Sequence, residues 1–214
     1  MLRPFRLIML AALALLVYMG FFQVPADRGG VADFDPAIVA RHEVEAWKAA
    51  KAHEEFGAFI AHVMQMRELH RYTWFRAVQT GLDQARSSLT FVQLRGRYER
   101  VLPNLEAIAA VEKTWKRAAF DPAAVARAEL NWMVTARMPN LNDLNDIAGQ
   151  MAEDYGLRYG LRPDQMFAAA APRAEAFKIM ITSDVDPDWP GIQALLEQSY
   201  AALRHALKPQ APAV

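Results

Sequence analysis

The chain has 214 residues, with 24 basic and 24 acidic side chains, no cysteine and 53% hydrophobic residues. The lack of cysteine excludes disulfides, thiol catalysis and cysteine-held metals, and the lack of a basic block argues against nucleic acid as a partner. Alanine, leucine, glutamate and arginine are abundant, whereas β-branched residues rarely cluster. This composition favours helices, and we expect an all-α protein.

The first 24 residues have the character of a membrane anchor. Arg3 and Arg6 precede an uncharged run over 7–24 (LIMLAALALLVYMGFFQV), which is close to the shortest length that spans a bilayer. The run ends in bulky residues rather than in the small residues of a cleavage site. Positive charge before the run and acidic residues after it place the N-terminus in the cytoplasm. The sequence therefore predicts a single-pass signal anchor.

One sequence motif typical of a helix start occurs twice in the chain. Residues 34–44 (FDPAIVARHEV) and 120–130 (FDPAAVARAEL) share Phe, Asp, Pro, Ala, Val, Ala, Arg and Glu in the same order. In each copy the aspartate suits the N-cap and the proline suits the first helical position. A second match pairs 102–108 (LPNLEAI) with 189–195 (WPGIQAL) at an offset of 87 positions, against 86 for the first. These matches predict a tandem duplication.

The duplication sets the expected organisation of the chain. A linker over 25–33 follows the anchor, because this stretch contains one proline and two adjacent glycines. A helical domain over 34–207 comes next, as two related three-helix repeats at about 34–119 and 120–207. Residues 208–214 are expected to form a disordered tail. The predicted fold is a helical bundle of six or seven helices behind one N-terminal transmembrane helix.

Two of the expected helices carry specific predictions. The first is expected to run from 36 to about 70, since no proline interrupts it and Gly57 is its weak point. A later helix over 165–180 contains Pro172, which is expected to bend or split it. No stretch alternates convincingly at a period of two, so no strand is expected.

Two glutamates, Glu43 and Glu129, occupy equivalent positions in the two copies. Helices related by a pseudo-twofold axis would bring their carboxylates together, as in carboxylate-bridged di-metal bundles. The Glu-x-x-His partner of such sites is missing, so we predict no metal site. The favoured interpretation is structural: Arg41 would pair with Glu129, and Arg127 with Glu43, and the two ion pairs would fix the packing of the repeats.

The tryptophans offer a second interpretation of the same region. Core packing with a satisfied indole N–H is the simplest role for them. The alternative is a ligand pocket between the helices, which is where bundles hold cofactors. The candidate lining residues are Glu43, Glu129, Trp47 and Trp132. No pattern selects a cofactor, because the haem-attachment motif is absent and no histidine spacing suits a metal.

No common catalytic motif occurs in the sequence. Nucleophile-elbow, Walker, dinucleotide and His-Glu-x-x-His patterns are all missing. Ser87 and Ser88 lie within a helical pattern with no base nearby in the sequence. His42, His53, His62 and His70 fall on the predicted first helix and are interpreted as solvated or locally hydrogen-bonded. The sequence therefore favours a protein that is not an enzyme.

The repeated start at 34–43, the second copy running through Glu129-Leu130-Asn131-Trp132, and the closing Asp188-Trp189-Pro190 resemble a family of uncharacterised bacterial proteins with a short N-terminal hydrophobic segment. The resemblance covers most of the domain. It implies a membrane-anchored helical protein, and it carries no known activity and no catalytic residues.

These observations lead to one leading hypothesis and one alternative. The leading hypothesis is a domain anchored in the bacterial inner membrane and facing the periplasm, with a binding or scaffolding role. Its partners would be the membrane and either another protein or a second copy of itself. The alternative is an enzyme or carrier that holds a ligand or metal between the two repeats. For the location, the alternative is a periplasmic or secreted protein released by signal cleavage.

Overall fold

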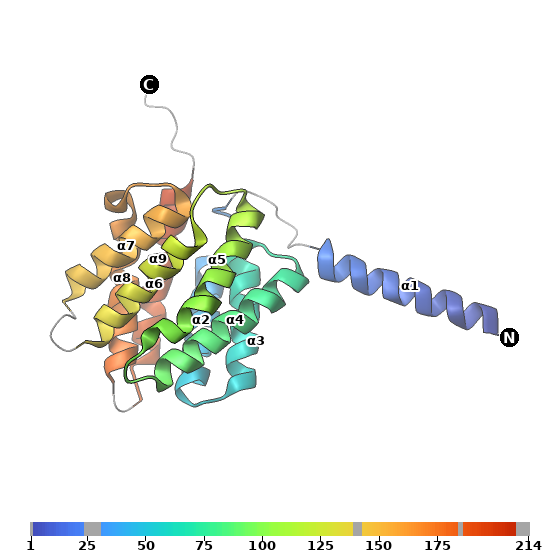
Figure 1. Ribbon diagram of the computed structural model, residues 1–214, viewed down its shortest axis with the longest axis horizontal. Helices are drawn as coiled ribbons and strands as arrows, with labels where there is room; N and C mark the ends of the chain where they lie inside the picture. The colour runs from blue at the N-terminus through green and yellow to red at the C-terminus, as the bar shows by residue number, and fades with distance from the viewer. Residues whose placement is uncertain (1, 24–30, 139–142, 184–185, 209–214) are drawn as a thin grey trace, which may run out of the picture.

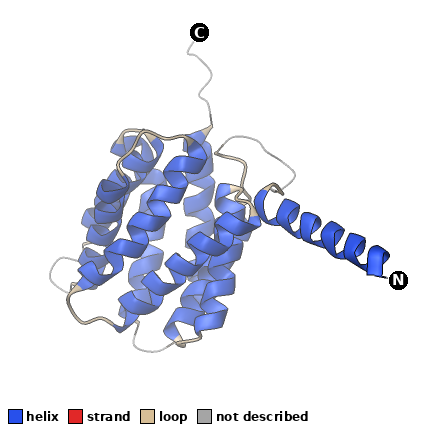
Figure 2. Cartoon of the chain, turned by 45° about the vertical axis from the view of Figure 1, so that its right-hand side comes forward, coloured by secondary structure: helices blue, strands red, loops and turns tan. Residues whose placement is uncertain are grey.

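The computed structural model describes residues 2–23, 31–138, 143–183 and 186–208, with side chains from residue 11 onward. All regular structure within these ranges is helical (Figures 1 and 2), which confirms the predicted all-α class. The helices are α1 (Leu2–Phe21), α2 (Pro36–Lys51), α3 (Glu55–His70), α4 (Trp74–Gln93), the short 3₁₀ helix η1 (Tyr98–Val101), α5 (Leu102–Lys116), α6 (Pro122–Arg137), α7 (Leu144–Tyr159), α8 (Pro163–Thr182) and α9 (Trp189–Leu207).

Aspartate side chains begin α2 and α6. The carboxylate of Asp35 accepts a hydrogen bond from the backbone N–H of Ala37 at 2.9 Å, and Asp121 accepts one from Ala123 at 3.2 Å. These bonds satisfy N–H groups that have no partner inside the helix. The same device begins α7 and α9. Both predicted helix starts are therefore confirmed.

The single helix predicted from 36 to 70 is wrong, because α2 ends at Lys51 and α3 begins at Glu55. Between them His53 has a φ of 57°, the left-handed conformation that ends a helix. The two helices then pack closely: a Cβ added at Gly57 would lie 3.3 Å from the Cβ of Ala49. Small residues make this approach possible, and Ala49, Ala58 and Ala85 form a buried cluster here.

This break changes the helix count. The described part of the domain has eight α-helices, α2–α9, rather than six or seven, and each predicted repeat contains four of them instead of three. Helices α2–α5 have 16, 16, 20 and 15 residues, and α6–α9 have 16, 16, 20 and 19. Pro172 lies buried within α8, which it does not split. The duplication itself stays a prediction.

The eight helices of the domain form a closed ring. Each packs against the next in chain order, and α9 packs against α2. In Figure 1, α5 and α6 lie in front, α2 and α9 behind, α3 and α4 on the right, and α7 and α8 on the left. The main cluster of buried apolar side chains lies chiefly between α2, α6, α7, α8 and α9, while α3 and α4 share a smaller cluster. The inner faces of all eight helices therefore surround one interior.

Helix α1 extends away from this ring (Figure 1) and touches it at one place. The ring of Phe21 stacks on that of Phe75 in α4, with 4.7 Å between centroids. Among the residues whose side chains are described, no helix has the length and apolar character needed to cross a bilayer. The predicted anchor stays a prediction. Most of the predicted linker and all but the first residue of the predicted tail lie outside the described residues.

Candidate functional site

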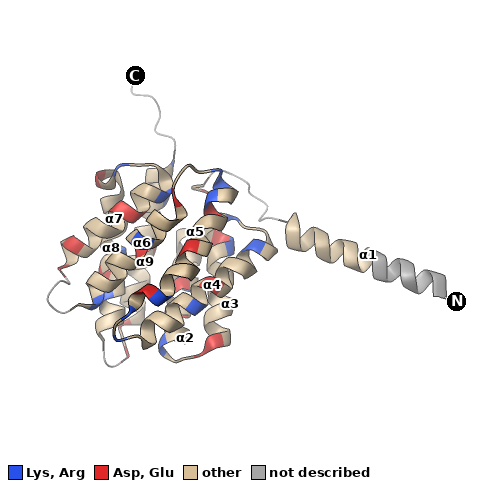
Figure 3. Cartoon of the chain, in the orientation of Figure 1, with Lys and Arg blue, Asp and Glu red and all other residues tan. Residues whose placement is uncertain are grey.

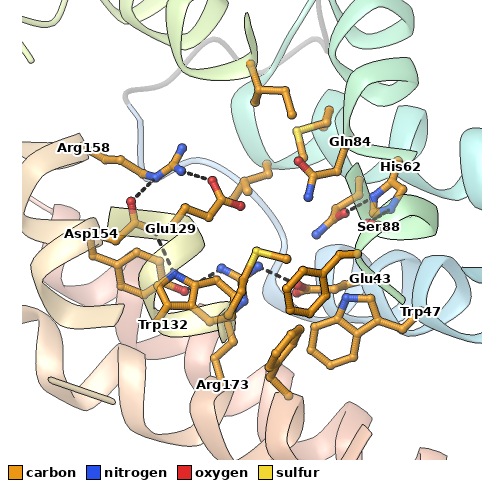
Figure 4. Close-up of a pocket in the computed structure, with 18 of the residues that line it drawn as sticks. Glu43, Trp47, His62, Gln84, Ser88, Glu129, Trp132, Asp154, Arg158 and Arg173 are labelled. Carbon is orange, nitrogen blue, oxygen red and sulfur yellow. Dashed lines mark hydrogen bonds and ion pairs between the residues drawn. The ribbon is translucent and has the colours of Figure 1, made fainter. Parts of the chain in front are cut away.

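The ring of helices surrounds a partly open cavity of about 90 Å³, lined by side chains from all eight helices α2–α9. A cavity of roughly 10–15 Å³ is enough for one water molecule, so this space has room for several waters or a small organic group. Charged, polar and aromatic side chains line it together (Figure 4). The cavity is therefore the candidate ligand-binding site inside the domain.

One wall of the cavity is built around Glu43 of α2. Its Oε1 accepts a hydrogen bond from Arg173 Nη2 at 2.6 Å, and its Oε2 accepts one from the Tyr200 hydroxyl at 2.6 Å. Arg173 also donates to the hydroxyl of Tyr155 at 2.8 Å. Both partners of Glu43 come from the second half of the chain. This buried carboxylate therefore ties α2 to α8 and α9.

A chain of hydrogen bonds continues from Glu43 into the first half of the domain. The Gln65 amide donates to the Tyr200 hydroxyl at 3.3 Å, and the Gln65 carbonyl faces His62 Nδ1 at 3.1 Å. His62 Nε2 lies 3.0 Å from Ser88 Oγ. The Glu43 carboxylate can only accept hydrogen bonds, so Tyr200 donates to Glu43 and accepts from the Gln65 amide. The Gln65 carbonyl then accepts from His62, which means that Nδ1 of His62 carries the proton and that Ser88 donates to Nε2.

The opposite wall is built around Arg158 of α7. Its guanidinium donates to Asp154 at 2.8 Å, to Glu112 at 2.8 Å and to Glu129, so it contacts three carboxylates. Glu112 also pairs with Lys116 at 2.6 Å. The Arg158 side chain is 11% exposed and that of Glu112 is fully buried. This cluster joins α5, α6 and α7.

Carboxylates outnumber cations in these two clusters. Glu43, Glu112, Glu129 and Asp154 face Arg173, Arg158 and Lys116, so four acidic groups meet three basic ones. The nearby histidines do not supply the missing charge, because burial lowers the pKa of His62 to about 4 and that of His70 to about 3. The interior therefore carries one uncompensated negative charge when every carboxyl is ionised.

The excess charge falls on Glu129 and Asp154. Burial raises the pKa of both carboxyls, and Arg158 opposes the shift. Glu112 differs: although burial opposes it, Lys116 and Arg158 hold its pKa below the usual range. Either a proton on one of the two carboxyls or a bound cation would balance the charge.

Several polar atoms at the cavity have no partner within the described part of the chain. One oxygen of Glu129 bonds Arg158, and the other makes no hydrogen bond and points into the space shown in Figure 4. The side-chain amide of Gln84 points into the same space (Figure 4). The Nε of Arg173 is buried and unpaired. Such atoms are expected to bind water or a ligand.

Aromatic rings complete the cavity wall. Phe177 lies at the centre of them, edge-on to Trp132 at 5.0 Å and to Trp47 at 5.7 Å between centroids. The Trp132 indole N–H donates to Asp154 at 3.4 Å, which fixes the ring beside the charged cluster. The cavity wall therefore holds an indole ring next to a carboxylate, with the guanidinium carbon of Arg173 5.9 Å from the ring centroid.

All four candidate residues from the sequence, Glu43, Glu129, Trp47 and Trp132, line this one cavity. The predicted arginine partners are wrong: Arg41 and Arg127 are exposed, and Glu43 pairs with Arg173 while Glu129 pairs with Arg158. The reason is helical geometry. A residue two positions before a buried glutamate lies about 200° around the helix and faces solvent.

None of the partners of Glu43 and Glu129 was predicted from the sequence. Within a helix, the pairs Asp154–Arg158 and Glu112–Lys116 have the four-residue spacing that marks contact, so a search for such pairs would have found them. Ser88 was also expected to lack a base, yet His62 lies beside it. That contact, like Glu43–Arg173, joins segments far apart in the chain and has no local signal.

The comparisons with known proteins add no identification. No family model matches the sequence, and no curated protein and no solved structure matches it. In the described residues, no group of three or more His, Asp or Glu side chains is arranged to hold a metal ion. The interpretation of the cavity therefore depends on its own geometry.

Proposed function

We propose that this protein is a ligand-binding helical domain, held at a membrane by its N-terminal helix, and that the ligand occupies the cavity inside the ring. The observation that carries the proposal is the interior space of about 90 Å³ into which an unbonded oxygen of Glu129 points. This oxygen is not among the buried side-chain atoms that lack a partner, so it is accessible from the cavity. An accessible carboxylate oxygen beside a cavity is placed to accept a hydrogen bond from a ligand.

The ligand class follows from charge and wall chemistry. Four carboxylates against three cations favour a ligand with one positive charge. The Glu129 oxygen would accept a hydrogen bond from an ammonium group, and the face of Trp132 would favour the same cation. Phe177 and Met133 would contact a short apolar substituent. We therefore propose a small organic cation, such as a short-chain amine.

Thermal unfolding with added probes tests this proposal. We expect propylammonium and tetramethylammonium chlorides to raise the Tm of the full chain and sodium propionate to leave it unchanged. Glu129→Gln should abolish the shift, while Glu153→Gln on the exposed side of α7 should keep it. A shift of equal size with propionate, or one that survives in Glu129→Gln, would contradict the proposal.

The His62–Ser88 pair supports a second candidate, acyl transfer. Ser88 Oγ donates to a neutral imidazole at 3.0 Å, and Gln65 orients that imidazole at 3.1 Å, which is the arrangement of an activated nucleophile. A fluorophosphonate probe would then modify Ser88. Ser87 is the adjacent serine and is buried, so Ser87→Ala is the control and should still react with the probe. Ser88→Ala should not react. Absence of labelling in the unmodified chain would reject this candidate.

The location and origin of the domain are part of the same proposal. Arg3 and Arg6 before the apolar run favour a cytoplasmic N-terminus and a domain on the outer side of a bacterial inner membrane. Two copies of a four-helix unit, 34–119 and 120–207, would account for the repeated Asp-Pro starts and the similar order of helix lengths. The resemblance to membrane-anchored bacterial proteins points the same way.

A further inference from the structure

The outer surface of α3 and α4 is unusually apolar for a water-soluble domain. Among the described residues from 31 onward, eleven large apolar side chains are exposed, and six of them lie on these two helices. They are Phe56, Ile60 and Met64 on α3, and Phe75, Val78 and Leu82 on α4. The other five, Val31, Met138, Leu144, Leu157 and Phe167, are distributed over other parts of the domain.

These six residues form one face. On α3 they recur every four residues, and on α4 they follow a three-then-four spacing, so each set forms a single stripe along its helix. The two helices pack side by side, and their inner sides line the same cavity through His62 and Gln84. Their outer stripes therefore point the same way, out of the ring. We call these six residues the α3–α4 apolar face.

Charge is scarce on this face. No Asp, Glu, Lys or Arg occurs from Phe56 to Met64, and within 75–82 the one charged residue, Arg76, places its guanidinium over the Trp115 ring at 4.5 Å. Elsewhere acidic and basic residues are spread over the helices of the domain (Figure 3). Patches of this kind mark interaction sites.

The position of α1 indicates what covers the face. Phe21, in the last turn of α1, stacks on Phe75, which is itself a member of the face. The face is therefore continuous with the apolar N-terminal helix, which carries no charged residue over 11–21, where its side chains are described (Figure 3). Figures 1 and 2 show α1 leaving the domain on the side of α3 and α4. A helix inserted in a bilayer would bring that side to the lipid.

We infer that the α3–α4 apolar face rests on the surface of the lipid bilayer, so that the domain is docked on the membrane and not merely tethered to it. Arg67 lies over the Trp74 ring at 4.0 Å and donates to the carbonyl of Gln23, just after α1. Arg86, four residues after Leu82, is 60% exposed and lies 3.9 Å from Asp83. These two cations would meet anionic headgroups at the margin of the face. Aromatic rings such as Phe56 and Phe75 would enter the interface. The inference rests on the proposed anchoring by α1.

Single-cysteine labelling tests the inference directly, because the chain contains no cysteine of its own. Ile60→Cys and Val78→Cys place an environment-sensitive NBD fluorophore on the face. Leu157→Cys is the matched control, since Leu157 is an exposed apolar residue on α7, on the other side of the ring (Figure 1). Each full-length variant is reconstituted in vesicles of equal parts phosphatidylcholine and phosphatidylglycerol, and flotation reports anchoring.

We expect the floated protein to show blue-shifted emission at positions 60 and 78 and a loss of that emission when the lipids carry nitroxide-labelled chains. Position 157 should show neither effect. If the protein floats but positions 60 and 78 behave like 157, the docking inference fails and the anchor stands. A blue shift without nitroxide quenching would assign the face to a second copy of the chain and also overturn the inference. Protein that does not float would defeat both proposals.

Discussion

Tyr200 donates a hydrogen bond of 2.6 Å to the buried carboxylate of Glu43, 157 residues earlier in the chain. The two residues join α9 to α2 and so close the ring. Both residues are almost completely buried, at 1% exposure each. The bond is therefore shielded from bulk solvent, where a hydrogen bond is electrostatically stronger than in water.

Removal of that hydroxyl should destabilise the domain. We expect Tyr200→Phe to lower the free energy of unfolding by about 1.5–3 kcal/mol, because the lost bond is to a charged acceptor. Tyr72→Phe is the matched control: Tyr72 is equally buried, and within the described residues its hydroxyl has no partner. Its removal should cost nothing or stabilise the protein. Chemical denaturation of the two variants measures the difference, and equal losses would contradict the assigned bond.

Arg158 should be among the most sensitive positions in the chain. Arg158→Met would leave Glu112, Glu129 and Asp154 without their shared partner. Breaking a buried ion pair from one side costs about 3–5 kcal/mol, and we expect a loss of at least that order in denaturant titrations. Arg162→Met, which removes an exposed pair with Asp164, should change stability by less than about 1 kcal/mol.

His62 should make the stability depend on pH. Its pKa is lowered by burial from 6.5 to about 4, so the folded protein keeps the ring neutral while the unfolded chain takes up a proton below 6.5. The contribution of neutral His62 to the free energy of unfolding is complete above pH 6.5 and is lost as the pH falls from 6.5 towards 4. His62→Gln should reduce the slope of the stability profile in this window and leave the part that His70 contributes, because burial lowers the pKa of His70 to about 3. His205→Gln, on the exposed side of α9, should leave the slope unchanged. Unfolding curves recorded across the window measure both slopes.

Two glycines should respond in opposite ways to alanine. A Cβ at Gly81 would lie 2.8 Å from the backbone N and Cα of Val63, so α3 and α4 would have to move apart. We expect Gly81→Ala to cost about 1–3 kcal/mol. At Gly149 in α7 nothing lies within 4 Å of the added atom, and Gly149→Ala should stabilise the helix by about 0.5–1 kcal/mol. Thermal unfolding of the two variants should show shifts of opposite sign.

Local rules account for the parts of the molecule that the sequence predicted. The Asp-Pro starts of α2 and α6 follow from capping chemistry, which involves residues a few positions apart. Glu43 and Trp47 are four residues apart and Glu129 and Trp132 are three apart, so each pair shares one face of its helix and turns inward together. The four candidate residues could therefore be placed together without a structure.

The predictions that were wrong concern features that depend on contacts between residues far apart in the chain. The break after Lys51 contains neither proline nor glycine, and the helix turns back because the small residues Ala49, Ala58 and Ala85 allow close packing. The partner of Glu43 is Arg173, which is 130 residues away. No rule based on neighbouring residues can select that arginine from the others, because the choice is made by the closure of the ring.

The contact between α2 and α9 has one more consequence. Arg204 in the last helix donates to the backbone carbonyl of Phe34, just before the first helix of the ring, at 3.4 Å. The start and the finish of the folded domain therefore lie next to each other, and each helix has a neighbour on both sides. A gene rearranged to begin at Asp121, with residue 208 connected to residue 31 by a short peptide, would encode the same set of helix contacts in a different order.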